Sequence, residues 1–137
     1  MSSEFIWPIR VYYEDTDAGG VVYYANYLKF FERARSEWLN HLGIDQPKLL
    51  AENIVFVVKN ANVDFASPAK LNDELEVVTR IIEMRGVSLV FQQQLFRRDD
   101  RHKVLCEGTI KVACLKLESF TPCRIPAAVK EEFQRVC

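Results

Sequence analysis

Apolar and polar residues recur along this chain with two periods, one typical of a helix and one typical of strands. From Asn26 to Leu42 the large apolar side chains return every three or four residues, and Gly43 follows. This spacing predicts an amphipathic helix of about four turns that ends at the glycine. A weaker helical stretch is expected from Pro47 to Glu52, and a short C-terminal helix with Pro126 in its first turn.

Most of the remaining chain has the composition of strands. A first strand is expected over residues 8–15, which are rich in β-branched and aromatic side chains and run into the turn-forming segment 16–20. Four longer strand-like runs follow, at residues 54–66, 74–84, 88–98 and 103–117. Their connections are short and contain no crossover helix, which favours antiparallel pairing. The predicted fold class is α+β, with the long helix against a curved antiparallel sheet, in the order strand, helix and four strands.

Composition narrows the functional classes. The chain has 137 residues, 49% of them hydrophobic, which predicts one domain over residues 1–137 with a substantial core. Eighteen Lys and Arg against nineteen Asp and Glu give a net charge of -1, without the basic excess typical of nucleic-acid binding. The N-terminus has no signal-peptide pattern, and no apolar run is long enough to span a membrane. We therefore expect a cytoplasmic protein that binds no nucleic acid.

The cysteines are the next candidates for chemistry. They lie at positions 106, 114, 123 and 137 and lack the C-x-x-C spacing of a zinc site. Alternation along the last strand puts Cys106 and Cys114 on its apolar face, which predicts buried structural thiols. His41 and His102 have no acidic or cysteine neighbours at ligand spacing. We expect reduced thiols and no metal site.

The segment between the first strand and the long helix carries the more specific signal. It runs from Tyr12 to Tyr27 and packs three acidic residues and two glycines before an aromatic-rich helix entry. Asp17 lies in the loop that leads to the helix N-terminus, where unpaired N–H groups and the helix dipole can stabilise an oxyanion. A carboxylate beside such donors suits attack on an activated acyl group, although the same residue types are also ordinary turn formers.

The chain also resembles a known family. The segments that carry the resemblance are residues 11–23, Asn26-Tyr27, Phe31-Glu32-Arg33-Ala34-Arg35, Phe56-Val57-Val58-Lys59 and residues 84–91. They are similar to the hotdog-fold acyl-CoA thioesterases, most of all to the YbgC branch associated with the Tol-Pal system, and less to the 4-hydroxybenzoyl-CoA thioesterases. The resemblance spans nearly the whole chain and implies a long helix wrapped by a curved antiparallel sheet.

The resemblance implies a thioesterase that acts on acyl-CoA, or on acyl carrier protein, without a metal or bound cofactor. Asp17 matches the family's catalytic carboxylate, as a general base or as a nucleophile. The backbone amide of Tyr24 matches the donor that polarises the thioester carbonyl. The YbgC branch normally has His where this chain has Tyr24, so a non-catalytic acyl-CoA or acyl-carrier-protein binding module on the same fold is the alternative.

Further expectations concern the surface. Three basic residues are expected to contact the CoA phosphates, namely Lys59, Arg85 and Arg124. Four other charged residues are expected to be surface or subunit-contact charges, namely Glu14, Glu32, Arg33 and Arg35. The family pairs its subunits edge to edge, which implies a homodimer or a homotetramer. Its association with Tol-Pal adds a peripheral position at the inner membrane to the expected cytoplasmic location.

Overall fold

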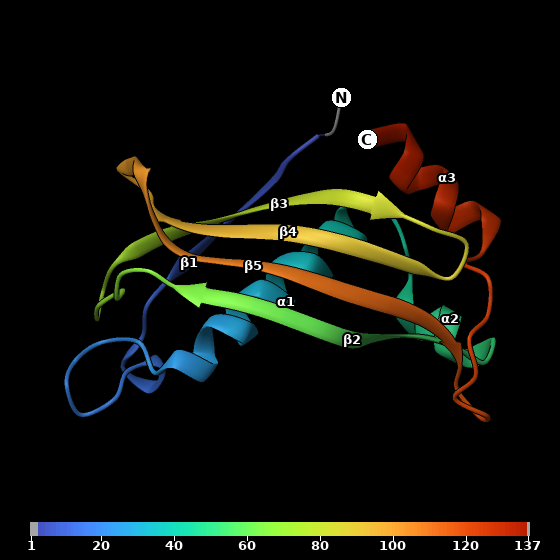
Figure 1. The fold of residues 1–137 in the computed structure, drawn as a ribbon, viewed down its shortest axis with the longest axis horizontal. Helices are drawn as coiled ribbons and strands as arrows, with labels where there is room; N and C mark the ends of the chain where they lie inside the picture. The colour runs from blue at the N-terminus through green and yellow to red at the C-terminus, as the bar shows by residue number, and fades with distance from the viewer. Residues whose placement is uncertain (1–2, 137) are drawn as a thin grey trace.

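A long antiparallel sheet frames the molecule, and one long helix lies along it (Figure 1). The structure, a computed structural model, describes residues 3–136. The strands are β1 (Phe5–Arg10), β2 (Ile54–Phe65), β3 (Glu74–Met84), β4 (Ser88–Arg97) and β5 (Asp100–Lys116). The helices are α1 (Tyr24–His41), α2 (Gln46–Ala51) and α3 (Ala127–Val136).

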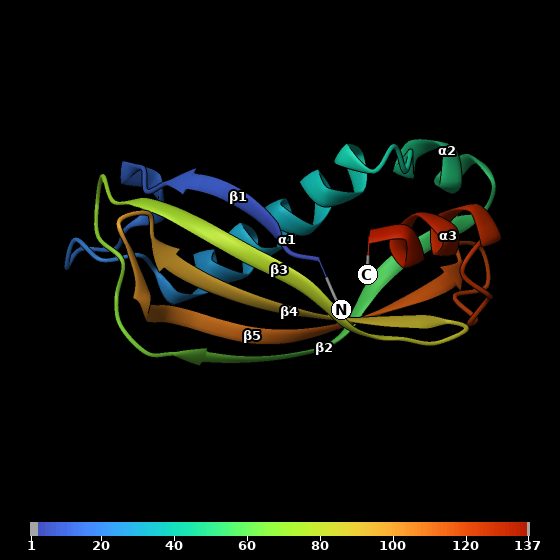
Figure 2. The same cartoon turned by 90° about the horizontal axis from the view of Figure 1, so that it is seen from above.

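Every pair of neighbouring strands is antiparallel, and the order across the sheet is β1-β3-β4-β5-β2. The edges are therefore β1 and β2. Figure 2 shows the sheet curving beneath α1, with α2 and α3 together at one end. This confirms the predicted α+β class, the antiparallel pairing and the order strand, helix and four strands. Pro126 precedes the first turn of α3 instead of lying within it, and its carbonyl accepts the Lys130 N–H.

The core lies between α1 and the concave face of the sheet. The apolar stripe predicted for the helix is confirmed, because Phe30, Phe31 and Ala34 are fully buried there. Gly43 follows the helix with a φ of 78°, a left-handed conformation that suits glycine, as the sequence predicted. Cys106 and Cys114 are buried on the same side of β5, as predicted.

The first strand is where the sequence prediction was wrong. It ends at Arg10, and a 3₁₀ turn over Tyr13–Asp15 replaces its second half. The Asp15 carboxylate accepts hydrogen bonds from the Tyr12 N–H and from the Asn26 side-chain amide, both at 2.9 Å. These bonds fold the segment back towards the helix, so strand alternation does not decide where Asp15 points. The same turn lets α1 begin at Tyr24, earlier than the predicted Asn26.

Candidate active site

A tight hairpin places Asp17 beside the start of α1. The Asp17 N–H donates to the Val21 carbonyl at 3.0 Å, and the Tyr23 N–H donates to the Asp15 carbonyl at 2.9 Å. The turn between them is closed by the Gly20 N–H, which donates to the Asp17 carbonyl at 3.0 Å. Gly20 has a φ of 77°, so the turn requires the conformational freedom of glycine at this position. The hairpin therefore fixes the Asp17 backbone relative to the helix start.

The Asp17 side chain is exposed at the tip of this hairpin. Its Oδ1 accepts a hydrogen bond from the Gly19 N–H at 2.9 Å, in an Asx turn. Its Oδ2 has no hydrogen-bond partner among residues 3–136. One carboxylate oxygen thus orients the group, and the other is accessible to a ligand.

The Tyr24 amide is the first donor of α1. The preceding residue, Tyr23, has no side chain that caps the helix, and its carbonyl accepts the Asn26 N–H at 2.8 Å. Within the described part of the chain, the Tyr24 N–H has no acceptor. Tyr24 as a residue is 62% exposed, and its ring packs edge-on against Phe65, with 6.0 Å between ring centroids. The free N–H groups of this helix terminus can therefore bind an anion.

Buried polar contacts anchor this helix terminus to the rest of the molecule. The hydroxyl of Tyr27 accepts the Ala69 N–H at 3.0 Å, and the Ala69 carbonyl accepts the Val22 N–H at 2.8 Å. Burial raises the pKa of Tyr27, so its hydroxyl stays protonated at neutral pH. The Asp15–Asn26 pair described above is also buried. The helix start is thus held from two sides, and this role of Asp15 and Asn26 was not among the sequence predictions.

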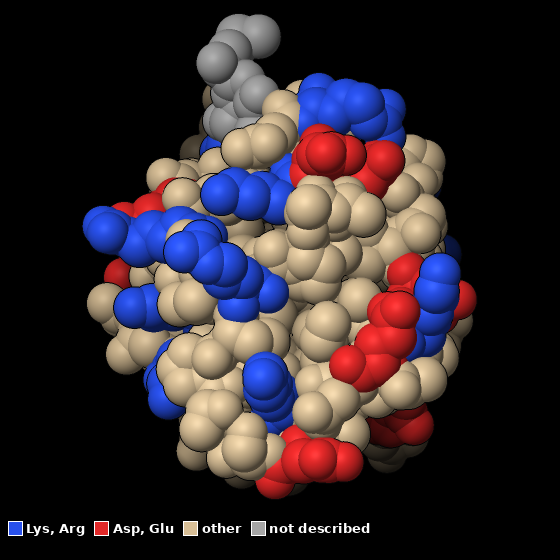
Figure 3. Space-filling model, turned by 90° about the vertical axis from the view of Figure 1, so that its right-hand side faces the viewer, with Lys and Arg blue, Asp and Glu red and all other residues tan. Residues whose placement is uncertain are grey.

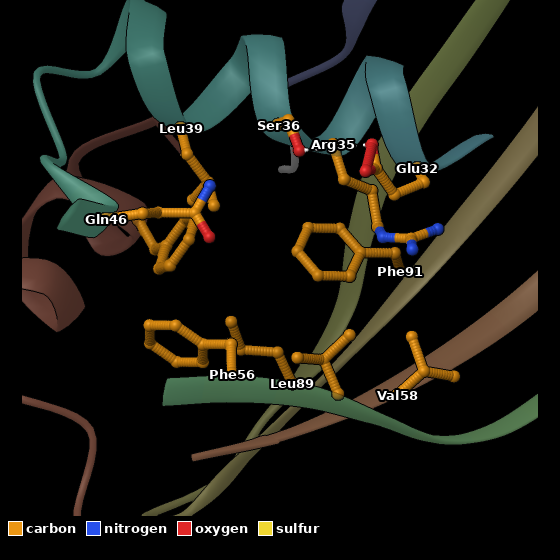
Figure 4. A pocket seen from close by; sticks show the side chains of 11 residues that line it. Glu32, Arg35, Ser36, Leu39, Gln46, Phe56, Val58, Leu89 and Phe91 are labelled. Carbon is orange, nitrogen blue, oxygen red and sulfur yellow. Dashed lines mark hydrogen bonds between the residues drawn. The ribbon is translucent and has the colours of Figure 1, made fainter. Parts of the chain in front are cut away.

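An apolar cavity of about 200 Å³ lies between α1 and the sheet (Figure 4). In the close-up, Glu32, Arg35 and Ser36 extend from the helix on one side of it. The opposite walls are apolar and come from β2, β4, β5 and α3, with the side chains of Phe56, Val58, Leu89, Phe91, Val112 and Phe133. Such a chamber, with a polar rim on one side, fits the apolar portion of a ligand better than its charged portion.

Arg35 is held at this cavity by a buried polar network. Its Nη1 donates to Gln93 Oε1 at 2.9 Å, and Gln93 Nε2 donates to the Phe31 carbonyl at 2.9 Å and to Thr79 Oγ1 at 3.0 Å. Gln93 and Thr79 have no exposed surface. Burial lowers the pKa of Arg35, and no carboxylate among residues 3–136 lies within ion-pair distance of it.

Arg35 is therefore not a free surface charge, and its role as a subunit contact stays a prediction. Glu32 and Arg33 are exposed as expected. Arg35 faces inward because Gln93 supplies an acceptor under the helix. A signal for this was present in the sequence, since Gln93 shares the parity of the buried Phe91 and Leu95 along β4.

The three basic candidates lie away from the hairpin. Lys59 is exposed at a bulge of the edge strand β2. Arg85 lies in the β3–β4 connection and pairs with Glu83 at 2.9 Å, and Arg124 extends over the neighbouring Gly86. That connection lies at the end of the sheet opposite to the hairpin that carries Asp17 (Figures 1 and 2). One subunit therefore does not bring these cations to Asp17 or to the Tyr24 amide.

At the end of the molecule with the β3–β4 connection, charged side chains surround a largely uncharged centre (Figure 3). Lys and Arg side chains gather mainly on one side of it, and most of the Asp and Glu side chains lie on the opposite side, at the top and at the bottom. Among residues 3–136, no group of three His, Cys, Asp or Glu side chains is placed to hold a metal ion. No helix in that part of the chain is both long and apolar enough to cross a membrane.

Comparisons with known proteins show the family of this chain. The model of the thioesterase-like superfamily matches residues 11–133. The acyl-CoA thioester hydrolase YbgC of Escherichia coli O6:H1 is 45% identical over 131 residues, which cover 96% of either chain. The acyl-CoA thioesterase YbgC of Haemophilus influenzae is 45% identical over 137 residues, covering 99% of this chain and 98% of that protein.

The solved structures support the fold. The 1,4-dihydroxy-2-naphthoyl-CoA thioesterase of Synechocystis superposes with a TM-score of 0.89 over 96% of each chain, at 20% identity. The hotdog fold expected from the sequence is thereby confirmed. Because the family model covers nearly the whole chain and the curated relatives share 45% of its residues, the chain belongs to the thioesterase-like superfamily and, within it, to the YbgC family of acyl-CoA thioesterases.

Proposed function

We propose that this protein hydrolyses acyl-CoA thioesters, consuming one water and releasing a carboxylic acid and the CoA thiol. The observation that carries the proposal is the Tyr24 N–H at the start of α1, which has no acceptor among residues 3–136 and follows the hairpin that presents Asp17. Membership in the YbgC family supports the same reaction. A backbone donor fixed in a helix stabilises a developing oxyanion without having to reorganise during the reaction.

Asp17 supplies the second half of the proposed chemistry. Asp17 lies opposite Val21 in the hairpin, and Tyr24 follows Val21 by three residues. At about 3.3 Å per residue, the backbones of Asp17 and Tyr24 are therefore on the order of 10 Å apart. A thioester group fits between them. In this arrangement the Tyr24 N–H donates to the carbonyl oxygen while the Asp17 carboxylate approaches from the hairpin.

Two routes remain open for the carboxylate. As a general base, Asp17 takes a proton from the water that attacks the acyl carbon. As a nucleophile, it attacks the acyl carbon itself, the thiolate leaves with the electron pair and takes up a proton, and water then hydrolyses the mixed anhydride. In both routes the negative charge on the carbonyl oxygen is stabilised by the Tyr24 N–H.

The cavity under α1 is the proposed seat of the acyl group. The apolar walls of this cavity suit an apolar chain or ring. Among the cavity residues on α1, Glu32 is the nearest to Tyr24 along the helix. At 1.5 Å per residue these two residues are about 12 Å apart along the axis. Within one subunit, the cavity therefore begins about two helical turns away from the proposed reaction centre.

A second subunit removes that separation. β2 is an edge strand, and edge-to-edge pairing about a two-fold axis is antiparallel, so the Phe65 end of one β2 meets the Ile54 end of the other. The Tyr24 ring rests on Phe65, and Phe56 lines the cavity. In such a dimer, the helix start of each subunit lies beside the cavity of its partner. This arrangement supports the predicted homodimer as the smallest active unit, and a homotetramer can be built from two of them.

The phosphate contacts, the carrier and the location belong to the proposal as well. Lys59, Arg85 and Arg124 are exposed and suit the CoA phosphates, which extend outward from the thioester. Acyl carrier protein is the second proposed carrier, since it presents the same thioester group. A cytoplasmic location, or a peripheral one at the inner membrane, completes the proposal.

The test is to measure turnover of a panel of aliphatic and aromatic acyl-CoA thioesters, with acyl carrier protein thioesters as a second series. The release of free thiol reports hydrolysis in both series. We expect hydrolysis of at least one acyl-CoA class by the wild-type protein. If every thioester binds and none is hydrolysed, the protein is the non-catalytic binding module and the proposal is wrong.

A further inference from the structure

Two cysteines face each other where the chain returns after β5. Leu115 pairs with Pro122 in a short antiparallel bridge, which places Cys114 directly opposite Cys123. The Cys123 N–H donates to the Cys114 carbonyl at 2.9 Å. The two Sγ atoms are 3.5 Å apart. The thiols are therefore in contact, although nine positions separate them in the sequence.

The backbone at this pair suits a disulfide. Directly opposed residues of two antiparallel segments have Cα atoms about 4.5–5.5 Å apart, which is within the range that disulfides span. The two Sγ atoms are 3.5 Å apart, so they must approach by about 1.5 Å to form an S–S bond. We propose that Cys114 and Cys123 are a dithiol oxidation site, which forms an intramolecular disulfide when the protein meets a disulfide oxidant such as oxidised glutathione.

The surroundings of the two thiols set the order of the steps. Cys123 is half-buried and within reach of a small oxidant, whereas Cys114 is buried. Burial, with a smaller contribution from the neighbouring Cys123, raises the pKa of the Cys114 thiol to about 12. Cys123 is therefore the attacking thiol and Cys114 the resolving one, because the thiolate is the reactive form and must be accessible.

The reaction balances with one oxidant molecule. The Cys123 thiolate attacks oxidised glutathione, forms a mixed disulfide and releases one glutathione thiolate. Cys114 then loses its proton and attacks the Cys123 sulfur, which expels the second glutathione thiolate. The two cysteines lose two electrons and two protons in total, and one oxidised glutathione becomes two reduced molecules.

Cys106 is a natural internal control. It is fully buried, burial raises its pKa to about 12, and no other thiol among residues 3–136 contacts it. It shares with Cys114 the apolar surroundings and the raised pKa, but it lacks the opposed partner. A reaction that depends on proximity will therefore spare Cys106.

The disulfide would close a loop across the turn that leads to α3. The ring spans residues 114–123, and the following segment carries Phe133 to the wall of the cavity. Cross-linking restricts the unfolded chain, so we expect the oxidised protein to melt higher than the reduced one by roughly 5–10 °C.

The test is peptide mapping of the full chain. The reduced protein is incubated at pH 8 with oxidised glutathione, free thiols are alkylated, and the protein is cut with trypsin. Trypsin cleaves after Lys111, Lys116 and Arg124, so the expected disulfide joins the peptides 112–116 and 117–124. Cys106 and Cys137 fall in other peptides. We expect the linked pair to predominate, to disappear with dithiothreitol and to accompany the rise in melting temperature.

Two variants complete the experiment. Cys123→Ser, at the half-buried position, should abolish the linked peptide, and Cys106→Ser should leave it unchanged. The proposal is overturned if Cys123 remains glutathionylated without transfer to Cys114. It is equally overturned if the only disulfides formed involve Cys106 or Cys137. It is also overturned if no cysteine of the protein reacts while an exposed thiol added to the same incubation as a reference is fully oxidised.

Discussion

At the scale of single residues, the carboxylate of Asp17 carries the first prediction. Asp17→Asn keeps the size of the side chain and an oxygen that can accept the Gly19 N–H, so the hairpin is expected to persist. The amide can neither take up a proton nor act as a nucleophile. We expect kcat to fall by roughly 10²–10⁴, the range of a lost general base, without a change in oligomeric state.

The control for this variant is Glu14→Gln. Glu14 is an exposed carboxylate in the same segment, and its side chain has no hydrogen-bond or ion-pair partner among residues 3–136. The kcat of the Glu14→Gln variant should stay within a factor of two of the wild-type value. Asp17→Asn with wild-type activity in the thiol-release assay would rule out the proposed role of Asp17.

Tyr24 carries the second residue-scale prediction. Its ring is exposed and its hydroxyl has no hydrogen-bond partner among residues 3–136, whereas its backbone N–H faces the proposed oxyanion. Tyr24→Phe should therefore change kcat little. Tyr24→His introduces a group that titrates near neutrality, so we expect kcat to rise several-fold, with a new pH dependence between about pH 6 and 7.

The pH profiles of kcat for both variants show whether the side chain or the backbone N–H of residue 24 takes part in the reaction. If Tyr24→Phe loses turnover while it still binds a non-hydrolysable acyl-CoA, the phenol itself takes part in the reaction. The backbone N–H would then be insufficient on its own.

At the scale of elements, the contact of α1 with the sheet depends on Gly108. A Cβ added there would lie 3.1 Å from Val63 Cγ2, 3.3 Å from Phe31 Cε2 and 3.4 Å from the Asn62 carbonyl oxygen. Phe31 is fully buried and cannot move aside easily. Gly108→Ala should therefore lower the free energy of unfolding by about 1–3 kcal/mol through overpacking.

Gly86→Ala is the matched control for this substitution. A Cβ at Gly86 would have its nearest neighbour, the Arg124 guanidinium, at 3.8 Å, which is ordinary contact. Urea unfolding should show little loss of stability, or a small gain from reduced freedom of the unfolded chain. Equal losses of unfolding free energy in the Gly108→Ala and Gly86→Ala variants would contradict the close approach of α1 to the sheet at Gly108.

The start of α1 gives a second prediction at this scale. Asn26→Ala removes the side-chain donor to Asp15, a carboxylate that is only 4% exposed. The Asp15 carboxylate would keep the Tyr12 N–H as its remaining partner. We expect a loss of about 1–3 kcal/mol in unfolding free energy, the cost of leaving a buried polar group short of a hydrogen bond.

Asn40→Ala serves as the comparison for Asn26. Asn40 lies on the same helix but is exposed, and its side chain has no hydrogen-bond partner among residues 3–136. Chemical denaturation of the two variants should differ by at least about 1 kcal/mol. If they unfold alike, the buried pair does not brace the helix start.

At the scale of the whole molecule, the open edge of β2 predicts self-association. The strand is long, and unpaired N–H and C=O groups line its free side. Pairing with a second copy satisfies those groups and closes the cavity against the partner's helix start. We expect sedimentation to give a multiple of the subunit mass, a dimer or a tetramer. A mass of 15.9 kDa at micromolar protein concentration would contradict this.

The sequence by itself determined the fold class of this protein and most of its helices and strands, the end of the first strand excepted. The helical spacing of α1 and the limits of β3, at residues 74–84, followed from local periodicity, because burial on one face repeats with the period of the element. The segment around Asp17 was recognised from turn chemistry and family resemblance. Turn chemistry and the resemblance can both be read from the order of residues, so neither requires knowledge of the fold.

Only the tertiary structure decided which polar groups meet. Asp15 finds Asn26, Arg35 finds Gln93 and Cys114 finds Cys123, and none of these pairs lies within one element. The first pair ended the predicted strand early, and the second turned an expected surface charge inward. Such contacts depend on the register of the strands and on the position of the helix over them. Hydrophobic periodicity carries no information about either, because the pattern is the same whichever partner a buried polar group receives.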